Sequence, residues 1–399
     1  ISECLVGSEM CIRDRYKLQL NGKFAYDYTH YLSRDTVQFL QESVTKKMQF
    51  DNTYYQQDWY LSVVNMYSIL PVWDVSLSVD FQYNKLNAVM RGVGTPFTFP
   101  QRYTTWAALA TALNLGKWKL QADVLGTFVI EKVRNNVEAP DKSEFSPALI
   151  VGYKPFSNQD LNLRAFYKRI FRLPTFNDLY YAQIGFSQLN PEFTNQFNIG
   201  GSYQKTFKTG MIDRIALQMD VYYAAITDKI IAAPTGSSFR WMMTNMGKVE
   251  SKGVDVSTAV SGHIGLVKLH TNLTYSFTKA QDFTKINGKK LSSYGDQIPY
   301  TPWHSGSVIA GAEYGTWALN YSFIYVGERY NGAVNNIPRN YVEPWYTHDF
   351  SLQKEFRICS RYLLKASVEM NNALNQNYDV VLNYPMPGRN FRFVIGFSL

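Results

Sequence analysis

The sequence predicts an all-β fold, namely a transmembrane antiparallel β-barrel with about sixteen strands. Three observations predict it. Apolar and polar residues alternate along one run of the chain after another, and the connections between these runs alternate between short and long. The composition is rich in aromatic residues, at 16%, and poor in charged residues, at 18%, whereas soluble domains are roughly 25% charged.

The same composition excludes several other classes of protein. The aromatic content is too high for a disordered chain, and three Cys in 399 residues are too few for a disulfide scaffold. The mean hydropathy is −0.25, and no segment approaches the ~18 consecutive apolar residues that a membrane-spanning helix requires. Hydrophobic residues are therefore plentiful but spread one in two, as in strands with one apolar face.

Residues 1–15 do not share this alternation. They also lack the basic start, apolar centre and small-residue cleavage site of a secretory signal. The stretch from Leu5 to Asp14 resembles a sequencing-library adapter translated as protein. We therefore expect residues 1–15 to be a non-native segment and residues 16–399 to be the C-terminal part of the barrel. Of the three Cys, only Cys359 lies in this second part, and we expect it to be an incidental thiol.

Alternation begins at Tyr16. Side chains of a strand point to opposite faces in turn, so a run with one apolar and one polar parity predicts a strand with one lipid-facing side. About sixteen such runs follow one another up to Leu399, and many of them reach the ~9–11 residues that a tilted strand needs to cross a bilayer. The clearest cover residues 16–32, 73–83, 118–130, 317–325 and 391–399.

The lengths of the connections suggest an orientation. Outer-membrane barrels have short periplasmic turns and longer extracellular loops, so Tyr16 and Leu399 should both lie on the periplasmic side. A soluble propeller is the alternative, but its strands average ~5–6 residues and its blades repeat every ~40–50 residues. We expect short connections near residues 70–71, 115–116, 156–160, 208–211, 262–265, 314–316 and 359–361, and long ones near 33–52, 86–102, 134–144, 172–190, 233–240, 281–298, 329–343 and 376–388.

Several motifs then occur in a fixed order along the chain. They are FRLPTFNDLYY at 171–181, LNPEFTNQFNIG at 189–200, NMG at 245–247 with SKGVD at 251–255, PYTPWH at 299–304, and NALNQNY at 372–378 with YPMPGR at 384–389. Together they resemble the barrel part of TonB-dependent outer-membrane receptors. Two residues depart from the pattern: Asn198 stands where a Glu is usual, and Leu399 where Phe is common.

The motif residues favour a role in folding more than in ligand contact. Pro174 cannot donate to a strand ladder and should end a strand. Gly247 and Gly253 within strand patterns indicate a bulge or a close backbone approach, and the Pro and Gly residues before the last strand predict a stiff bend. The full set is Pro174, Pro191, Glu192, Gly200, Asn245, Gly247, Gly253, Tyr384, Pro385, Pro387, Gly388 and Arg389.

No enzyme signature stands out. The sequence has no GxxxxGK[ST] or HExxH motif, and its five His residues show no metal-ligand spacing. The basic residues that give the net charge of +8 are scattered, which does not fit a nucleic-acid surface. We expect no enzyme, no metal site, no cofactor and no nucleic-acid partner.

The resemblance implies energy-coupled uptake across the outer membrane. Such receptors have a plug inside a barrel of 22 strands and a TonB box near the N-terminus, and both the plug and about six strands are expected to be missing from this chain. The implied partners are the TonB energy-coupling complex, acting through the missing N-terminal part, and outer-membrane lipid with lipopolysaccharide. The implied ligand is a small-molecule chelate of the ferric siderophore, haem or cobalamin class. A passive porin or an adhesin barrel is the alternative.

Ligand contacts are expected on the long loops. Aromatic rings and Arg side chains suit such ligands by stacking and charge pairing, although girdle packing and lipopolysaccharide contact are competing roles. The candidates are Tyr180, Tyr181, Phe186, Arg240, Trp241, Arg329, Tyr330, Arg339 and Trp345.

Overall fold

The computed structural model describes residues 2–13, 15–38, 45–91, 97–135, 138, 140–180, 185–235, 240–358 and 362–398. The predicted all-β fold is confirmed, because seventeen strands of the described chain belong to one large antiparallel sheet and sixteen of them follow Tyr16. The chain divides into two compact units, residues 1–150 with 168–189 and residues 151–167 with 190–399. No helix among the described residues is long and apolar enough to cross a membrane.

The first unit is a set of antiparallel strands, each paired with the next along the chain. Two further strands, β7 and β8, run from one unit into the other, and a five-residue helix follows β8. The elements are β1 (Ser2–Arg13), β2 (Tyr16–Gln38), β3 (Thr45–Leu70), β4 (Trp73–Arg91), β5 (Gln101–Leu115), β6 (Trp118–Lys132), β7 (Lys142–Tyr153), β8 (Asp160–Arg172) and α1 (Phe176–Tyr180).

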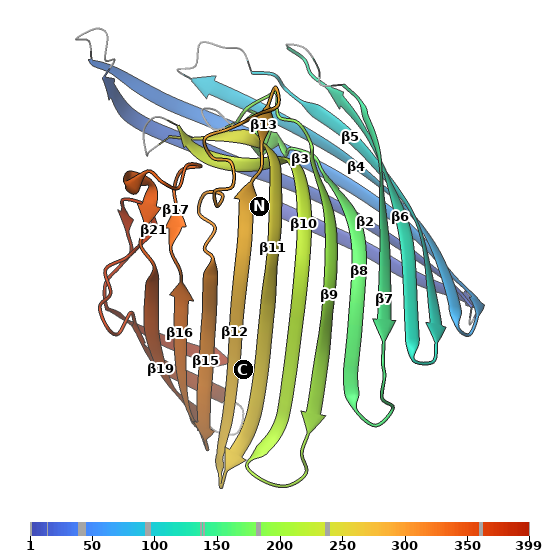
Figure 1. The fold of residues 1–399 in the computed structure, drawn as a ribbon, viewed down its shortest axis with the longest axis vertical. Coiled ribbons are helices and arrows are strands. Elements are labelled where there is room, and N and C mark those ends of the chain that lie inside the picture. Colours follow the sequence, from blue (N-terminus) through green and yellow to red (C-terminus); the bar gives the residue numbers. More distant parts are fainter. Residues whose placement is uncertain are drawn as a thin grey trace. The chain divides into compact units, whose positions relative to one another are not determined.

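The second unit continues the same antiparallel pattern. In Figure 1, the tight turns that follow β9, β11 and β15 lie at one end of its strands. The long strands are β9 (Glu192–Thr206), β10 (Ile212–Thr235), β11 (Arg240–Ile264), β12 (Val267–Asp282), β15 (His304–Tyr314), β16 (Trp317–Val326), β19 (Trp345–Ile358), β20 (Tyr362–Asn371) and β23 (Asn390–Ser398).

The long connections of the second unit carry small elements of their own. Between β12 and β15 lie β13 (Lys285–Ile286) and β14 (Lys289–Lys290). Between β16 and β19 lie β17 (Arg329–Tyr330), the 3-10 helix η1 (Pro338–Asn340) and β18 (Tyr341–Val342). Between β20 and β23 lie β21 (Asp379–Val381) and β22 (Tyr384–Pro385). The loops are therefore ordered by internal pairing.

Alternation explains the composition. In β4, Leu77, Val79 and Phe81 are 42–48% exposed, while the polar residues between them are less so. Buried apolar clusters occur instead beside the long connections. One contains Tyr54, Leu86, Ala88, Phe97 and Phe176, and the other contains Ala224, Ile226, Met246, Val249, Ala280 and Ile298.

Two hairpin tips differ from the expected connections. β2 and β3 remain paired as far as Gln38 and Thr45, and β10 and β11 as far as Thr235 and Arg240. Most of the residues expected as a loop at 33–52, and half of those at 233–240, are therefore strand. These two hairpins extend past the strands on either side of them. There the paired strands need no apolar face, so the sequence does not alternate and does not predict a strand. The expected turn at residues 359–361, with Cys359, lies outside the described residues.

The N-terminal segment also differs from expectation. Ser2–Arg13 forms β1, which pairs with β2 from Ser2 opposite Tyr26 to Arg13 opposite Tyr16. The missing alternation of this segment gave no sign of the strand. A strand edge offers unpaired N–H and C=O groups to any neighbouring segment, so pairing there does not require an alternating sequence. That residues 1–15 are non-native stays a prediction.

Candidate functional site

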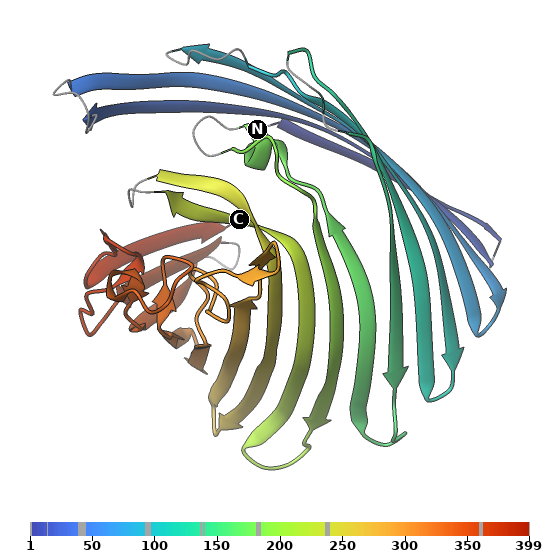
Figure 2. The same ribbon diagram turned by 45° about the horizontal axis from the view of Figure 1, so that its top comes forward.

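A short helix is held against the strands of the first unit. The Thr175 hydroxyl accepts the backbone N–H of Asp178 at 3.1 Å, and the Asp178 carboxylate accepts the N–H of Thr175 at 2.9 Å. This reciprocal cap is local, so the sequence alone can begin α1 here. Phe176 then packs into the aromatic cluster beside Tyr54 and Phe97. Figure 2 shows α1 as a short green coil.

A buried ion pair lies beneath this helix. Arg102 donates to Glu131 Oε1 through Nε at 2.9 Å and Nη2 at 2.5 Å, and the two residues are only 7% and 6% exposed. The remaining guanidinium nitrogen of Arg102, Nη1, donates to the Pro174 carbonyl at 2.8 Å. The Arg102 guanidinium lies 5.0 Å from the centre of the Phe176 ring. We call α1 with Arg102 and Glu131 the α1 platform. Pro174 ends β8 and also ties the platform to β5.

Two predicted ligand residues lie at the α1 platform. Tyr180 is the last residue of α1 and half-buried, with its ring 5.9 Å from that of Phe176. Burial, together with the charge of Glu131, raises the pKa of Tyr180 to about 12, so it remains a neutral hydroxyl at any physiological pH. Phe186 is 39% exposed, while its backbone N–H donates to the Asp178 carbonyl at 2.8 Å. Tyr181 lies outside the described residues.

In the second unit, Asn245 joins two connections. Its side-chain oxygen accepts the N–H of Asn190 at 2.8 Å, and its amide donates to the carbonyls of Asn190 at 3.1 Å and Asp228 at 2.7 Å. Nearby, the Glu192 carboxylate accepts the N–H of Ile230 at 2.9 Å, and Pro191 between them is buried. These motif residues hold backbone, as a role in folding requires.

Gly200 makes room for a second ion pair. Arg164 contacts both carboxylate oxygens of Asp220, at 2.7 and 2.5 Å, and a Cβ on Gly200 would fall on that carboxylate. Asn198 also hydrogen-bonds Asp220. At the position of Asn198, the TonB-dependent receptors usually have Glu. The Asn198 amide stabilises the Asp220 carboxylate, whereas a second carboxylate would repel it. Gly253 is similar, because a Cβ there would meet the Phe277 carbonyl and Tyr222.

A fully buried amide organises the connection between β12 and β15. Gln297 is 0% exposed, accepts the N–H of Ala280 at 3.0 Å, and donates to the carbonyls of Thr278 and Thr301 at 3.0 and 3.2 Å. Asn335, from the next long connection, binds both the N–H and the C=O of Gln297, at 2.7 and 3.0 Å. Two long loops are therefore joined by amide hydrogen bonds.

The C-terminal motifs clamp one another. The Asn372 amide donates to the carbonyls of Gln376 at 2.8 Å and Pro387 at 3.3 Å. Asn375 accepts the N–H of Arg389 at 2.9 Å, and a Cβ on Gly388 would lie 2.7 Å from the same Asn375 oxygen. Arg389 in turn donates to the Ala373 carbonyl at 2.8 Å. Tyr384 and Pro385 form β22 and are exposed.

Arg329 has a different setting from the one expected. It is 3% exposed, and its guanidinium donates to the carbonyls of Asp379 at 2.6 Å, Val380 at 3.2 Å and Gly327 at 3.4 Å. Burial lowers the pKa of Arg329. Its donors hold the backbone of β21, and contact of Arg329 with a ligand stays a prediction.

The remaining candidates are spread over the second unit. Tyr330 meets Tyr341 edge to face at 6.0 Å, and Arg339 is exposed on η1. Trp345 stacks on Tyr378 with 4.6 Å between ring centres. The backbones of Arg240 and Trp241 belong to β11, but their side chains lie outside the described part.

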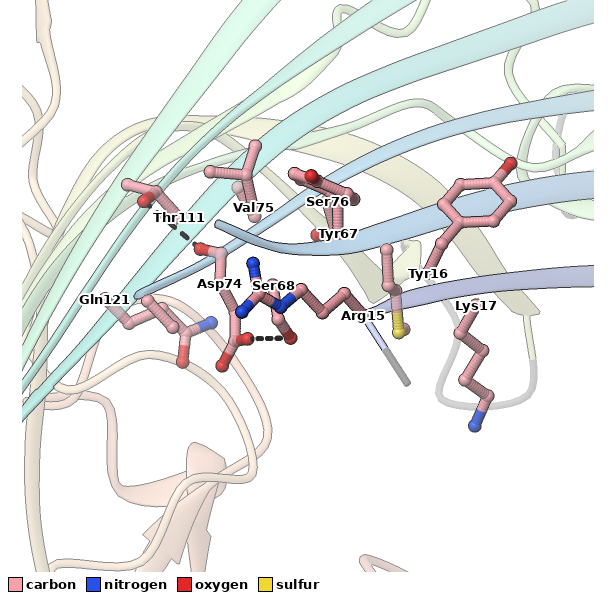
Figure 3. A pocket seen from close by; sticks show the side chains of 13 residues that line it. Arg15, Tyr16, Lys17, Tyr67, Ser68, Asp74, Val75, Ser76, Thr111 and Gln121 are labelled. Atoms are coloured by element: carbon pink, nitrogen blue, oxygen red, sulfur yellow. Dashed lines mark hydrogen bonds between the residues drawn. The ribbon is translucent and has the colours of Figure 1, made fainter. Parts of the chain in front are cut away.

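A cavity of 650 Å³ lies at the opposite end of the first unit's strands, beside the turn that joins β3 to β4. Its lining includes the charged residues Arg15, Lys17 and Asp74. Figure 3 shows Asp74 between Ser68, whose hydroxyl donates to it at 2.6 Å, and Thr111. No predicted ligand residue lines this cavity, and Arg15 belongs to the segment that we expect to be non-native.

Within the described residues, no group of three or more His, Cys, Asp or Glu could hold a metal ion. The match to a family decides the chain's identity: the model of the TonB-dependent receptor-like β-barrel matches residues 12–373. The chain belongs to this family. Barrels of this family lie in the outer membrane.

Solved structures agree on the fold. The unliganded ferric citrate transporter FecA superposes with a TM-score of 0.71 at 13% identity, over 99% of this chain and 60% of its own. BauA, the ferric preacinetobactin receptor from Acinetobacter baumannii, gives 0.71 at 12% identity, over 99% and 62%. Fiu, the ferric-catecholate import receptor from E. coli K12, gives 0.71 at 14%, over 99% and 63%. The chain thus spans less than two thirds of these proteins.

Sequence reasoning missed the residues that hold the loops. Arg102 and Glu131 stand 29 residues apart on β5 and β6, and Gln297 and Asn335 are 38 apart. No local pattern links such partners. For the pair of Arg102 and Glu131, the sequence offered one signal. Each is a charged residue at the end of an alternating run, on its polar side.

Proposed function

We propose that this protein is an outer-membrane receptor for energy-coupled uptake of a scarce chelated ligand, with a ferric siderophore as the favoured class and haem or cobalamin as the others. The observation that carries the proposal is the contrast between the ends of the strands. Within each unit, tight turns lie at one end of the strands. In the first unit the other end carries the α1 platform, and in the second unit the long connections are held by buried amides. A preformed loop surface suits ligand capture because little ordering is left for binding.

The ligand would meet exposed aromatic and basic side chains of these loops. Phe186 and Arg339 are exposed, and the Tyr180 hydroxyl stays protonated. The other proposed contacts are Tyr181, next to α1 in the sequence, Tyr330 and Trp345 on either side of Arg339 in the sequence, and Arg240 and Trp241 at the start of β11. Arg329 is proposed as a support for them, because its donors already bind backbone carbonyls.

The proposed partners and orientation follow from family membership. The TonB energy-coupling complex would act through an N-terminal plug and TonB box, which are expected upstream of this chain. Both Tyr16 and the C-terminus would face the periplasm, since the tight turns would lie there. Exposed aromatic and basic residues near the strand ends would meet lipid and lipopolysaccharide.

Uptake of an iron-55 siderophore in cells that lack their own receptors tests this function. The gene extended upstream to its natural start should restore accumulation in cells with TonB and not in cells without it. The isolated chain should not restore it, and restoration would show that the expected plug is dispensable. Accumulation that does not depend on TonB would contradict the proposal.

Conductance separates the receptor from a passive porin or adhesin barrel. The extended protein in planar bilayers should be nearly silent, because a plug fills the lumen. Arg339→Ala in the second unit should weaken siderophore binding by about tenfold, the effect of losing ~1.4 kcal/mol, and Phe186→Ala in the first unit is tested separately. Exposed Lys117→Ala, at the turn before β6, is the matched control. Unchanged affinity in either variant would remove that residue from the proposed contacts.

A further inference from the structure

A cavity in the second unit lies between two of its long connections. It measures 420 Å³ and is formed by β18 with the residues that follow it, and by the segment from Asn377 to Met386. The lining combines the acidic Glu343 and Asp379, the rings of Tyr341 and Tyr378, and apolar groups such as Met386. This volume is within the range of small-molecule sites.

The walls are acidic, in a chain whose net charge is +8. Glu343 is exposed, and no ion pair to it is found in the described residues. Tyr341 donates to Glu328 Oε2 at 3.4 Å. Burial, followed by the charges of Glu328 and Glu343, raises the pKa of Tyr341, so both carboxylates act on the same phenol. The two carboxylates of the lining are those of Glu343 and Asp379.

One cation beside this cavity is already engaged. Arg329 lies behind the wall and directs its guanidinium at backbone carbonyls, including that of Asp379. The Asp379 carboxylate accepts the N–H of Asn383 at 2.9 Å, which fixes its position at the lining. Arg329 reduces the charge of the wall without occupying the cavity.

The aromatic walls are rigid. Tyr378 stacks on Trp345 with 4.6 Å between centres and 27° between planes, and Tyr341 packs edge to face on Tyr330 at 6.0 Å. Asn372 clamps the start of the segment that carries Tyr378. Fixed rings beside carboxylates attract a cation through both the ring faces and the charges.

We propose that this cavity binds the cationic end of a small organic ligand, namely an ammonium or guanidinium group on a short aliphatic stem. The carboxylates of Glu343 and Asp379 receive the charge, and Pro344, Leu382 and Met386 contact the stem. The inference rests on the proposed function and deepens it, because it assigns a charge class to one part of the ligand.

Calorimetry on the detergent-solubilised chain tests the proposal with three probes of equal length. At low salt, 1,5-diaminopentane should bind about tenfold more tightly than 1,5-pentanediol, and glutarate should not bind. Because the carboxylate of Glu343 is exposed, Glu343→Gln should weaken diamine binding by about threefold to fivefold. Glu313→Gln, at the turn end of β15, should leave it unchanged. Circular dichroism checks that both variants fold.

Equal binding of the diamine and the diol, or an unchanged affinity in Glu343→Gln, would overturn the proposal. The siderophore uptake measurement is independent of this one. TonB-dependent uptake without diamine binding would reject the cation-binding proposal alone. Diamine binding without uptake would reject the proposed function alone.

Discussion

The two units hold their loops by different chemistry. In the first unit, the α1 platform depends on charge, since Arg102 and Glu131 are both more than nine-tenths buried. In the second unit, neutral amides carry much of this task, with Gln297, Asn335, Asn245 and Asn372 each bound to backbone groups. Its buried Arg329 also donates to backbone carbonyls, and among the described residues it forms no buried ion pair beneath a loop. Removal of one partner of a buried ion pair costs much stability, because the other charge stays buried. Amide side chains instead distribute the stabilisation over many weaker hydrogen bonds. Removal of one partner of the ion pair should therefore release the whole α1 platform. We call these four amides of the second unit the second framework. Removal of one of them should cost only part of the stability, which is a graded response.

The largest effect is expected from Arg102→Met. It leaves Glu131 buried without its cation, which costs about 3–5 kcal/mol, and it also removes the donor to Pro174. Limited proteolysis and hydrogen exchange should show α1 released from the strands. The double variant Arg102→Met with Glu131→Leu should be less destabilised than the single one. Equal protection of α1 in Arg102→Met and the unmodified chain would contradict the claim that the buried ion pair holds α1 on the strands.

A smaller effect is expected from Gln297→Met, which keeps the volume and loses the hydrogen bonds of one buried amide. Unsatisfied buried groups cost about 1–3 kcal/mol, so the loops between β12 and β15 should exchange faster while α1 is unaffected. Exposed Gln188→Met in the first unit is the control. A global loss of structure in Gln297→Met would show that the second framework is not graded.

Gly200→Ala tests the ion pair on the strands rather than the loops. The added methyl group would displace the Asp220 carboxylate from Arg164, at a cost of about 1–3 kcal/mol. The matched control is Gly396→Ala, where the added Cβ meets its nearest neighbour at 4.0 Å. Urea denaturation in detergent should separate the two variants, and equal midpoints would contradict the assigned role of Gly200.

The smallest effect concerns pH. Because the pKa of Tyr180 is raised to about 12, its contribution to stability is complete below the ordinary tyrosine value of ~10 and is lost as pH rises through 12. The absorbance difference at 295 nm between the unmodified chain and Tyr180→Phe should titrate near 12. A midpoint near 10 would show that Tyr180 is not packed on the α1 platform.

Much of the fold was predictable because period-two alternation is a local property of the chain. It gave the sixteen strands after Tyr16 and most of the tight turns. It failed at the tips of β2–β3 and β10–β11, and at β1, where backbone pairing continues without an apolar face. The motifs marked Pro174, Gly200 and Asn245 as structural residues, but not what each of them touches.

By itself, the sequence determined the antiparallel strands and their apolar faces. It also carried the motifs of the receptor barrel family. Only the tertiary structure decided that Arg102 meets Glu131, that Gln297 meets Asn335, and that Arg329 is buried against β21. The physical reason is range. Alternation and capping act between residues a few positions apart, whereas these contacts depend on strand register and loop paths, which are set by the pairing of distant segments.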